Sequence, residues 1–179
     1  MKAIGDFLRH FRHQRQWTRT VVAAVPEDRF DWAPAADAFS CGELVRHLMQ
    51  SEIFWSRLLV KAAAGEAFDP FGLDGSAEER MRRFRASNLG SSRDARYGDS
   101  FAACLERWSE IQERTEAELA KLPDAALYEV EPEHPLTTLR APLWQMLLVM
   151  IEHEAHHRGQ LTAYLKMLGV EQRAAAIAT

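Results

Sequence analysis

The residues with the clearest capacity for chemistry lie near the C-terminal end of the chain, where His153, Glu154 and His157 spell H-E-x-x-H. Residues four apart lie on one face of a helix, so the two histidines would crowd each other unless an ion bridged them. Neutral imidazole nitrogens bind divalent metal ions at about 2.0–2.1 Å. The spacing therefore predicts a metal site at His153 and His157, with Glu154 as the candidate catalytic residue beside it.

Two other classes of metalloprotein contain the same sequence motif or the E-x-x-H within it. Zinc proteases with H-E-x-x-H take a third ligand from downstream, but the one acid that follows His157 is Glu171, beyond the predicted helix. Ala163 stands where the extended protease motif has its last histidine. Di-iron bundles need a second E-x-x-H in register, together with two more inward glutamates. A zinc metalloprotease therefore stays a remote alternative, and the di-iron site is set aside.

The helical repeat of about 100° per residue shows which side chains share a face. On the C-terminal helix, His157 falls on the side of the core leucines and methionines, His153 lies at its edge, and His156 points away. On an earlier helix, His47 borders the core in the same way. Ser51, one turn later, leaves space beside His47.

Four long segments with helical periodicity must position these residues. They span residues 4–25, 41–64, 100–122 and 141–168. Ser40 and Glu43 form a capping box at the start of the second helix, and Gly169 ends the fourth. The connection over residues 66–98 is long enough to imply a crossover. The predicted fold class is all-α, a four-helix bundle forming a single domain over residues 1–179.

Shorter elements are expected in the connections. A short helix is predicted around residues 77–86. The sequences LYEV (residues 127–130) and PLTTL (residues 135–139) are typical of extended backbone and predict a short two-stranded excursion or an extended loop before the last helix.

Composition narrows the function classes. The chain has 179 residues, of which 47% are hydrophobic and 27% charged, with a net charge of −4, so a nucleic-acid surface is not expected. Its longest uncharged apolar stretch is too short to span a membrane, and its start lacks the apolar region of a signal peptide. We therefore expect a cytoplasmic protein, with Cys41 and Cys104 as free thiols.

Three sequence blocks carry a resemblance to a known family. They are P-x-x-R-F-x-W after the first helix, S-C-G-E-L-V-R-H-L on the second, and H-E-A-H-H-R-G-Q-L-x-x-Y-L-x-x-x-G on the fourth. With the long crossover, they resemble the DinB/YfiT-like family of metal-binding four-helix bundles. The resemblance implies an up-down-down-up bundle with the crossover between helices two and three. It also implies a three-histidine site at His47, His153 and His157, holding nickel, zinc, iron or manganese.

Partners are implied as well. Proteins of the DinB/YfiT-like family are often homodimers, so the resemblance implies a homodimer. Some members are transferases that use bacillithiol or mycothiol, which implies a low-molecular-weight thiol as a small-molecule partner. A dimer also has support from the residues themselves. Trp144, Leu148, Val149 and Ile151 lie away from the core stripe of the last helix, so a second subunit or the crossover segment must cover them.

Two function hypotheses follow. The first is a metal-dependent enzyme, a thiol S-transferase or a hydrolase, in which Glu154 is the general base or instead orients His47 or His153. The second is a non-catalytic metal-binding or stress-response protein. The sequence leaves both open, along with the identity of the metal and the substrate.

Overall fold

Four long helices form the protein. The computed structural model describes residues 2–69, 75–76, 78–80, 82–83, 98, 100–134 and 139–170. The long helices are α1 (Ile4–Ala23), α2 (Cys41–Ala63), α4 (Phe101–Leu119) and α6 (Leu143–Met167), with a short 3-10 helix η1 (Glu27–Arg29) and a short helix α5 (Ala126–Glu129). The all-α prediction is confirmed in the described part of the chain.

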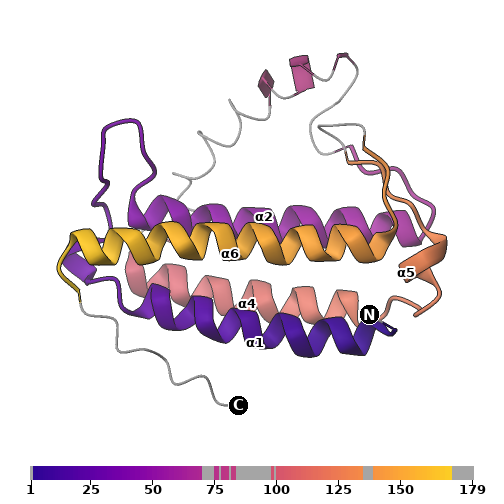
Figure 1. Cartoon of the computed structure of the whole chain (residues 1–179), viewed down its shortest axis with the longest axis horizontal. Helices are drawn as coiled ribbons and strands as arrows, with labels where there is room; N and C mark the ends of the chain where they lie inside the picture. Colours follow the sequence, from indigo (N-terminus) through magenta and orange to yellow (C-terminus); the bar gives the residue numbers. More distant parts are fainter. Residues whose placement is uncertain are drawn as a thin grey trace.

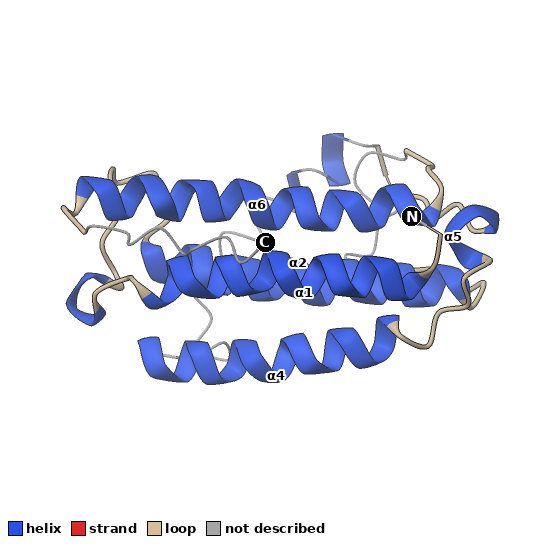
Figure 2. Cartoon of the chain, turned by 60° about the horizontal axis from the view of Figure 1, so that its bottom comes forward, coloured by secondary structure: helices blue, strands red, loops and turns tan. Residues whose placement is uncertain are grey.

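The long helices lie side by side in a bundle (Figures 1 and 2). Figure 1 shows α1 and α6 running in one direction and α2 and α4 in the other. Helix α2 packs against α4 and α6, and α1 packs against α6 and α4. Since α2 and α4 run in the same sense, the chain between them must cross the length of the bundle. In that connection, residues 78–80, 82 and 83 are helical, as predicted.

The start of α2 is held by its cap and by the preceding linker. Ser40 Oγ accepts a hydrogen bond from the Glu43 amide (3.1 Å), and Glu43 Oε2 accepts one from the Ser40 amide (2.8 Å), which confirms the capping box. The amide of Gly42 donates to the carbonyl of Phe30 at 2.7 Å. The Phe30 ring lies so close that a Cβ on Gly42 would be 2.7 Å from it. These contacts fix the first turn of α2, and His47 follows on the next.

The prediction for residues 127–130 is wrong in part. Leu127–Glu129 belong to α5 instead of an extended strand, and Leu127 is fully buried at one end of the bundle. Burial of this leucine outweighs the strand preference of the local sequence. Glu133 and Arg140 form an isolated antiparallel bridge nearby. Residues 135–138 of the second predicted stretch lie outside the described residues.

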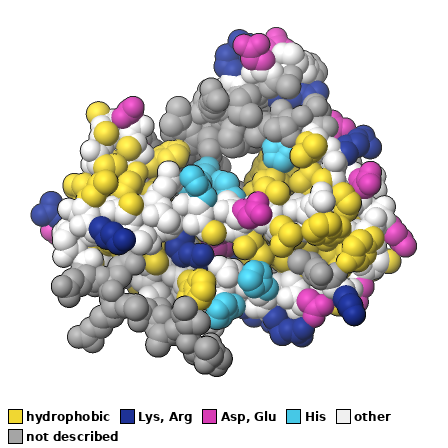
Figure 3. Space-filling model, viewed as in Figure 1, with side chains coloured by type: hydrophobic (Ala, Val, Ile, Leu, Met, Phe, Trp, Pro, Cys, Tyr) yellow, Lys and Arg dark blue, Asp and Glu magenta, His cyan; other side chains and the backbone are white. Residues whose placement is uncertain are grey.

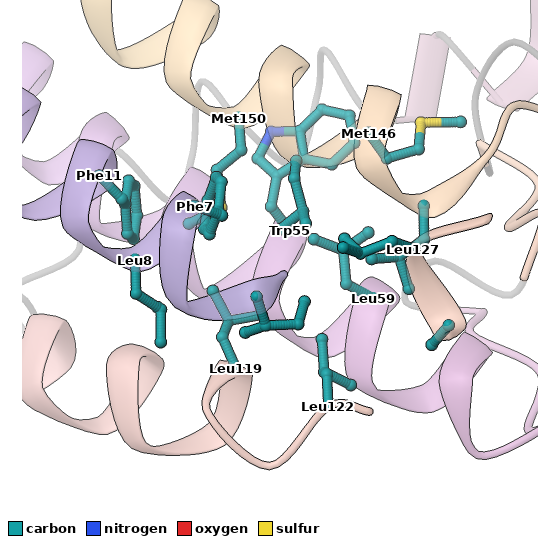
Figure 4. Packing of buried hydrophobic residues seen from close by; sticks show 14 of the residues in the cluster. Phe7, Leu8, Phe11, Trp55, Leu59, Leu119, Leu122, Leu127, Met146 and Met150 are labelled. Carbon is teal, nitrogen blue, oxygen red and sulfur yellow. The ribbon is translucent and has the colours of Figure 1, made fainter. Parts of the chain in front are cut away.

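The core has two apolar halves with polar side chains between them. Figure 4 shows part of one half, in which Phe7 and Phe11 of α1 lie with Trp55 of α2 and Met146 of α6. The other half gathers buried residues nearer the opposite ends of these helices, including Val22, Leu44, Trp108 and Leu161. The buried polar residues between the halves are Arg15, Thr18, His47, Glu52, Gln112, Thr115, Glu154 and His157. This polar layer contains the candidate site.

The cysteines and the apolar helices can be compared with what the composition led us to expect. Cys41 and Cys104 are both buried and form no disulfide with each other, as expected. None of the described helices is long and apolar enough to cross a membrane.

Candidate metal centre

Three histidines from two helices converge in the polar layer. Nε2 of His153 lies 3.2 Å from Nε2 of His47 and 3.1 Å from Nε2 of His157. One ligand nitrogen from each of the three lies within 4.8 Å of the other two, and among the described residues this is the group of side chains arranged to hold a metal ion. His47 and His157 are buried, while His153 is half-buried at the edge. The fold thus brings together all three predicted ligands.

The nitrogen spacing fits a shared ion. Two nitrogens bound at about 2.0–2.1 Å to one tetrahedral metal ion lie roughly 3.3–3.4 Å apart. The two close Nε2 pairs, at 3.2 and 3.1 Å, are near this separation. Without an ion, Nε2 of a neutral His153 carries either one hydrogen or one lone pair, so it can form a hydrogen bond with only one of its two neighbours. The donor set therefore suits a divalent metal ion.

Burial keeps the ligands in their neutral form. It lowers the pKa of His153 from its ordinary value of 6.5 to about 3, with smaller contributions from the neighbouring His157 and His47. Burial also lowers the pKa of His157. A histidine must be neutral to bind a metal, so both side chains are ready to do so at neutral pH.

Gln160 orients one ligand. Nδ1 of His157 lies 2.6 Å from Oε1 of Gln160, one turn later on α6. An amide oxygen accepts only, so the N–H of His157 is on Nδ1 and the lone pair on Nε2 is left for the cluster. His47 is held by stacking, with the Phe39 ring 5.5 Å from it between centroids.

The space beside the cluster is small. Ser51 Oγ lies 3.5 Å from Nε2 of His47, as the helical repeat suggested. A cavity of about 10 Å³ is lined by Ser51 and His153 among others, which is about the space that one water needs. In the space-filling view, histidine side chains reach this face of the molecule between areas of hydrophobic side chains (Figure 3). Access to the cluster is therefore from the His153 side.

The carboxylate of Glu154 contacts α1. Its Oε1 accepts a hydrogen bond from Thr18 Oγ1 at 2.6 Å, and its Oε2 lies 3.9 Å from Nε of Arg15. Arg158 donates to the same threonine oxygen at 3.2 Å. Glu154 is buried, but it does not belong to the group that could hold the ion. Its two oxygens join α6 to α1.

His156, which lies between the two ligands of α6, is outside the histidine cluster. His156 is exposed, and its ring centroid lies 4.9 Å from that of His157. It contributes no nitrogen to the cluster.

Sequence reasoning missed a buried ion pair in the same layer. Arg15 Nη2 lies 2.7 Å from Glu52 Oε1, and both side chains are almost fully buried. The Arg15 guanidinium also lies 3.5 Å over the ring of Phe11. A signal was present, because Arg15 lies four residues after Phe11 and Glu52 four residues after Leu48, on the core side of each helix.

Comparison with known proteins agrees with this architecture. A model of the DinB superfamily matches residues 10–161. Uncharacterized protein YjoA of Bacillus subtilis is 24% identical over 165 residues, covering 92% of this chain and 90% of YjoA. The crystal structure of this DinB-like YjoA superposes with a TM-score of 0.63 at 20% identity, covering 93% of this chain and 94% of the other. A DinB-like protein from Bacillus cereus superposes with a TM-score of 0.65 at 15% identity, covering 95% of each chain. Since the family match spans most of the chain and includes all three histidines, the chain belongs to the DinB superfamily.

Proposed function

We propose that this protein is a metal-dependent enzyme in which His47, His153 and His157 hold one divalent ion. The observation that carries the proposal is the convergence of their ligand nitrogens within 4.8 Å of one another. Three protein ligands leave further coordination positions open, as in catalytic zinc sites. A metal ion held in this way lowers the pKa of a bound water or thiol and polarises a carbonyl.

The proposed reaction is transfer or hydrolysis, in which a low-molecular-weight thiol or a water attacks an electrophile. The chain's own residues would present the ion on the half-buried side of His153 and keep the ligand rings fixed through Gln160 and Phe39. Glu154 is the candidate general base from the motif, but the contacts of its carboxylate with Thr18 and Arg15 favour a role in joining helices. Imidazole ligands suit nickel, zinc and iron, and manganese remains a candidate from the family resemblance alone.

A non-catalytic metal-binding or stress-response protein is the second candidate. It is favoured by the cavity beside the histidines, whose volume of about 10 Å³ has room for a water but not for a substrate. In this case the ion would stabilise the bundle or report metal availability.

Turnover distinguishes the two candidates. Purified protein loaded separately with each of the four metals is assayed with low-molecular-weight thiols and a chromogenic electrophile, and with ester and amide substrates for hydrolysis. The enzyme proposal expects turnover by at least one metal form and its loss in His47→Ala. Metal binding without turnover in any form would contradict the enzyme proposal and leave the non-catalytic candidate.

A second copy of the chain is proposed to cover the outer face of α6. Val149 is 38% exposed there, and Trp144 and Leu148 are half-buried, whereas Ile151 is buried by the chain itself. Sedimentation equilibrium is expected to show a dimer for the wild type and a shift to monomer for Val149→Glu. A monomeric wild type would contradict the proposed dimer.

A further inference from the structure

A buried charged cluster lies beside the three histidines and consists of Arg15, Glu52 and Glu154. The side chains come from α1, α2 and α6, and their residues are 3%, 6% and 7% exposed. Arg15 Nη2 lies 2.7 Å from Glu52 Oε1, and Arg15 Nε lies 3.9 Å from Glu154 Oε2. One guanidinium therefore stands between two carboxylates in the middle of the bundle.

Glu52 borders the same cavity as His153, one of the three candidate ligands. The cavity of about 10 Å³ is lined by Glu52, Ser51, His153 and Glu154 among others, a volume that holds about one water. Ser51 in turn lies 3.5 Å from the ligand nitrogen of His47. Glu52 therefore shares a space the size of one water with His153, one of the three candidate ligands, and little solvent screens its charge there.

Arg15 and Arg158 match the two carboxylates in number, but among the described residues Arg15 is the one cation that acts on Glu52. Arg15 is shared between two carboxylates, and the further cation, Arg158, acts on Glu154 at the other side of the cluster. Burial raises the pKa of Glu52 in spite of Arg15 and of hydrogen bonds with Thr115 and Trp108, so these groups do not fully offset the cost of burying the ionised carboxyl. Three neutral imidazoles add no positive charge. A divalent cation bound to them would add positive charge in the polar layer that contains Glu52.

We propose that the buried carboxylate of Glu52 is an electrostatic partner of the metal ion, raising the affinity of the three-histidine site for divalent cations without ligating them. This inference rests on the proposed metal site. It assigns Glu52 a role separate from the H-E-x-x-H motif and from the three ligands.

The test measures metal affinity, independently of any enzymatic activity. Dissociation constants for Zn²⁺ and Ni²⁺ are obtained with the full chain by competition against a chelator, for the wild type, Glu52→Gln and Glu52→Asp. Glu52→Gln is expected to bind about tenfold more weakly, the size typical for groups that support metal ligands. Glu52→Asp, which keeps the charge, is expected to stay within about threefold of the wild type. Glu110→Gln is the matched control, because Glu110 pairs with Arg107 and both side chains are exposed.

A spectrum and the thermal stability separate this role from others. The visible absorption of the Co²⁺ form is expected to be the same in the wild type and in Glu52→Gln, since the ligands do not change. A changed spectrum would make Glu52 a ligand and overturn the proposal.

Unchanged affinity with a lowered melting temperature would make Glu52 a structural ion-pair partner only, which also overturns it. If Glu52→Gln does not fold, a loss of about tenfold or more in Glu52→Asp overturns the proposal. A wild type that binds neither ion overturns the metal site itself.

Discussion

Nδ1 of His157 donates its proton to Oε1 of Gln160 across 2.6 Å, which leaves Nε2 of the histidine free to bind a metal ion. Removing the acceptor should let the ring rotate and change tautomer. We expect Gln160→Leu to weaken metal binding by about tenfold, and Gln160→Glu to bind at least as tightly as the wild type. Chelator competition with Zn²⁺ measures both. Equal affinity of Gln160→Leu and the wild type would remove the orienting role from Gln160.

Acid should destabilise the metal-free protein through His153. Burial lowers its folded-state pKa from 6.5 to about 3, so between these values the unfolded chain binds a proton that the folded chain does not. The contribution of His153 to stability is thus complete above pH 6.5 and decreases as the pH falls towards 3, by at most about 1.4 kcal/mol per pH unit. Thermal unfolding of the metal-free protein between pH 7.5 and 5 measures this slope. The slope should be smaller in His153→Leu, and an equal slope would contradict the assignment.

Glu154 should matter for stability more than for metal content. Its carboxylate accepts a hydrogen bond from Thr18 and lies near Arg15, so Glu154→Gln weakens the connection between α6 and α1. We expect a loss of about 1–3 kcal/mol in the free energy of unfolding, measured by urea denaturation, with the metal content unchanged. Glu152→Gln, an exposed position on the same helix, is the control. A stable Glu154→Gln variant that has lost turnover would instead assign the glutamate a catalytic role.

Gly42 should tolerate no larger side chain. A Cβ there would lie 2.7 Å from the Phe30 ring, so Gly42→Ala is expected to cost about 1–3 kcal/mol through overpacking. Gly159→Ala serves as the matched control, because a Cβ at this helical glycine meets nothing within 4 Å. The control should be neutral or more stable by about 0.5–1 kcal/mol. Urea denaturation compares the two, and a neutral Gly42→Ala would contradict the packing of the linker against α2.

The four long helices could be predicted from the sequence because their signals are local. The capping box at Ser40, Pro26 after the first helix and Gly169 after the last all act within a few residues, and the observed bounds lie close to the predicted ones. The pairing of His153 with His157 was readable for the same reason, since it follows from helical spacing alone. The meeting of His47 with this pair came from a family resemblance, because the contact joins helices 106 residues apart in sequence.

The buried charges could not be predicted with the same rules. Arg15 and Glu52 occupy core positions of their helices, but a charged residue at such a position normally turns to solvent unless a partner waits for it. That partner lies on another helix, and the periodicity of a single helix gives no information about it. Leu127 is a similar case, because its burial at the end of the bundle overrides the local preference for extended backbone.

Metal content after exposure to Zn²⁺ or Ni²⁺ and gel filtration tests the three-histidine site most directly. Elemental analysis should find about one ion per chain in the wild type and a strong loss in His47→Ala, His153→Ala and His157→Ala. His156→Ala should keep its ion, because His156 is exposed and adjacent to a ligand without being one. A wild type without bound metal, or a His156→Ala variant that loses as much metal as His157→Ala, would contradict the site.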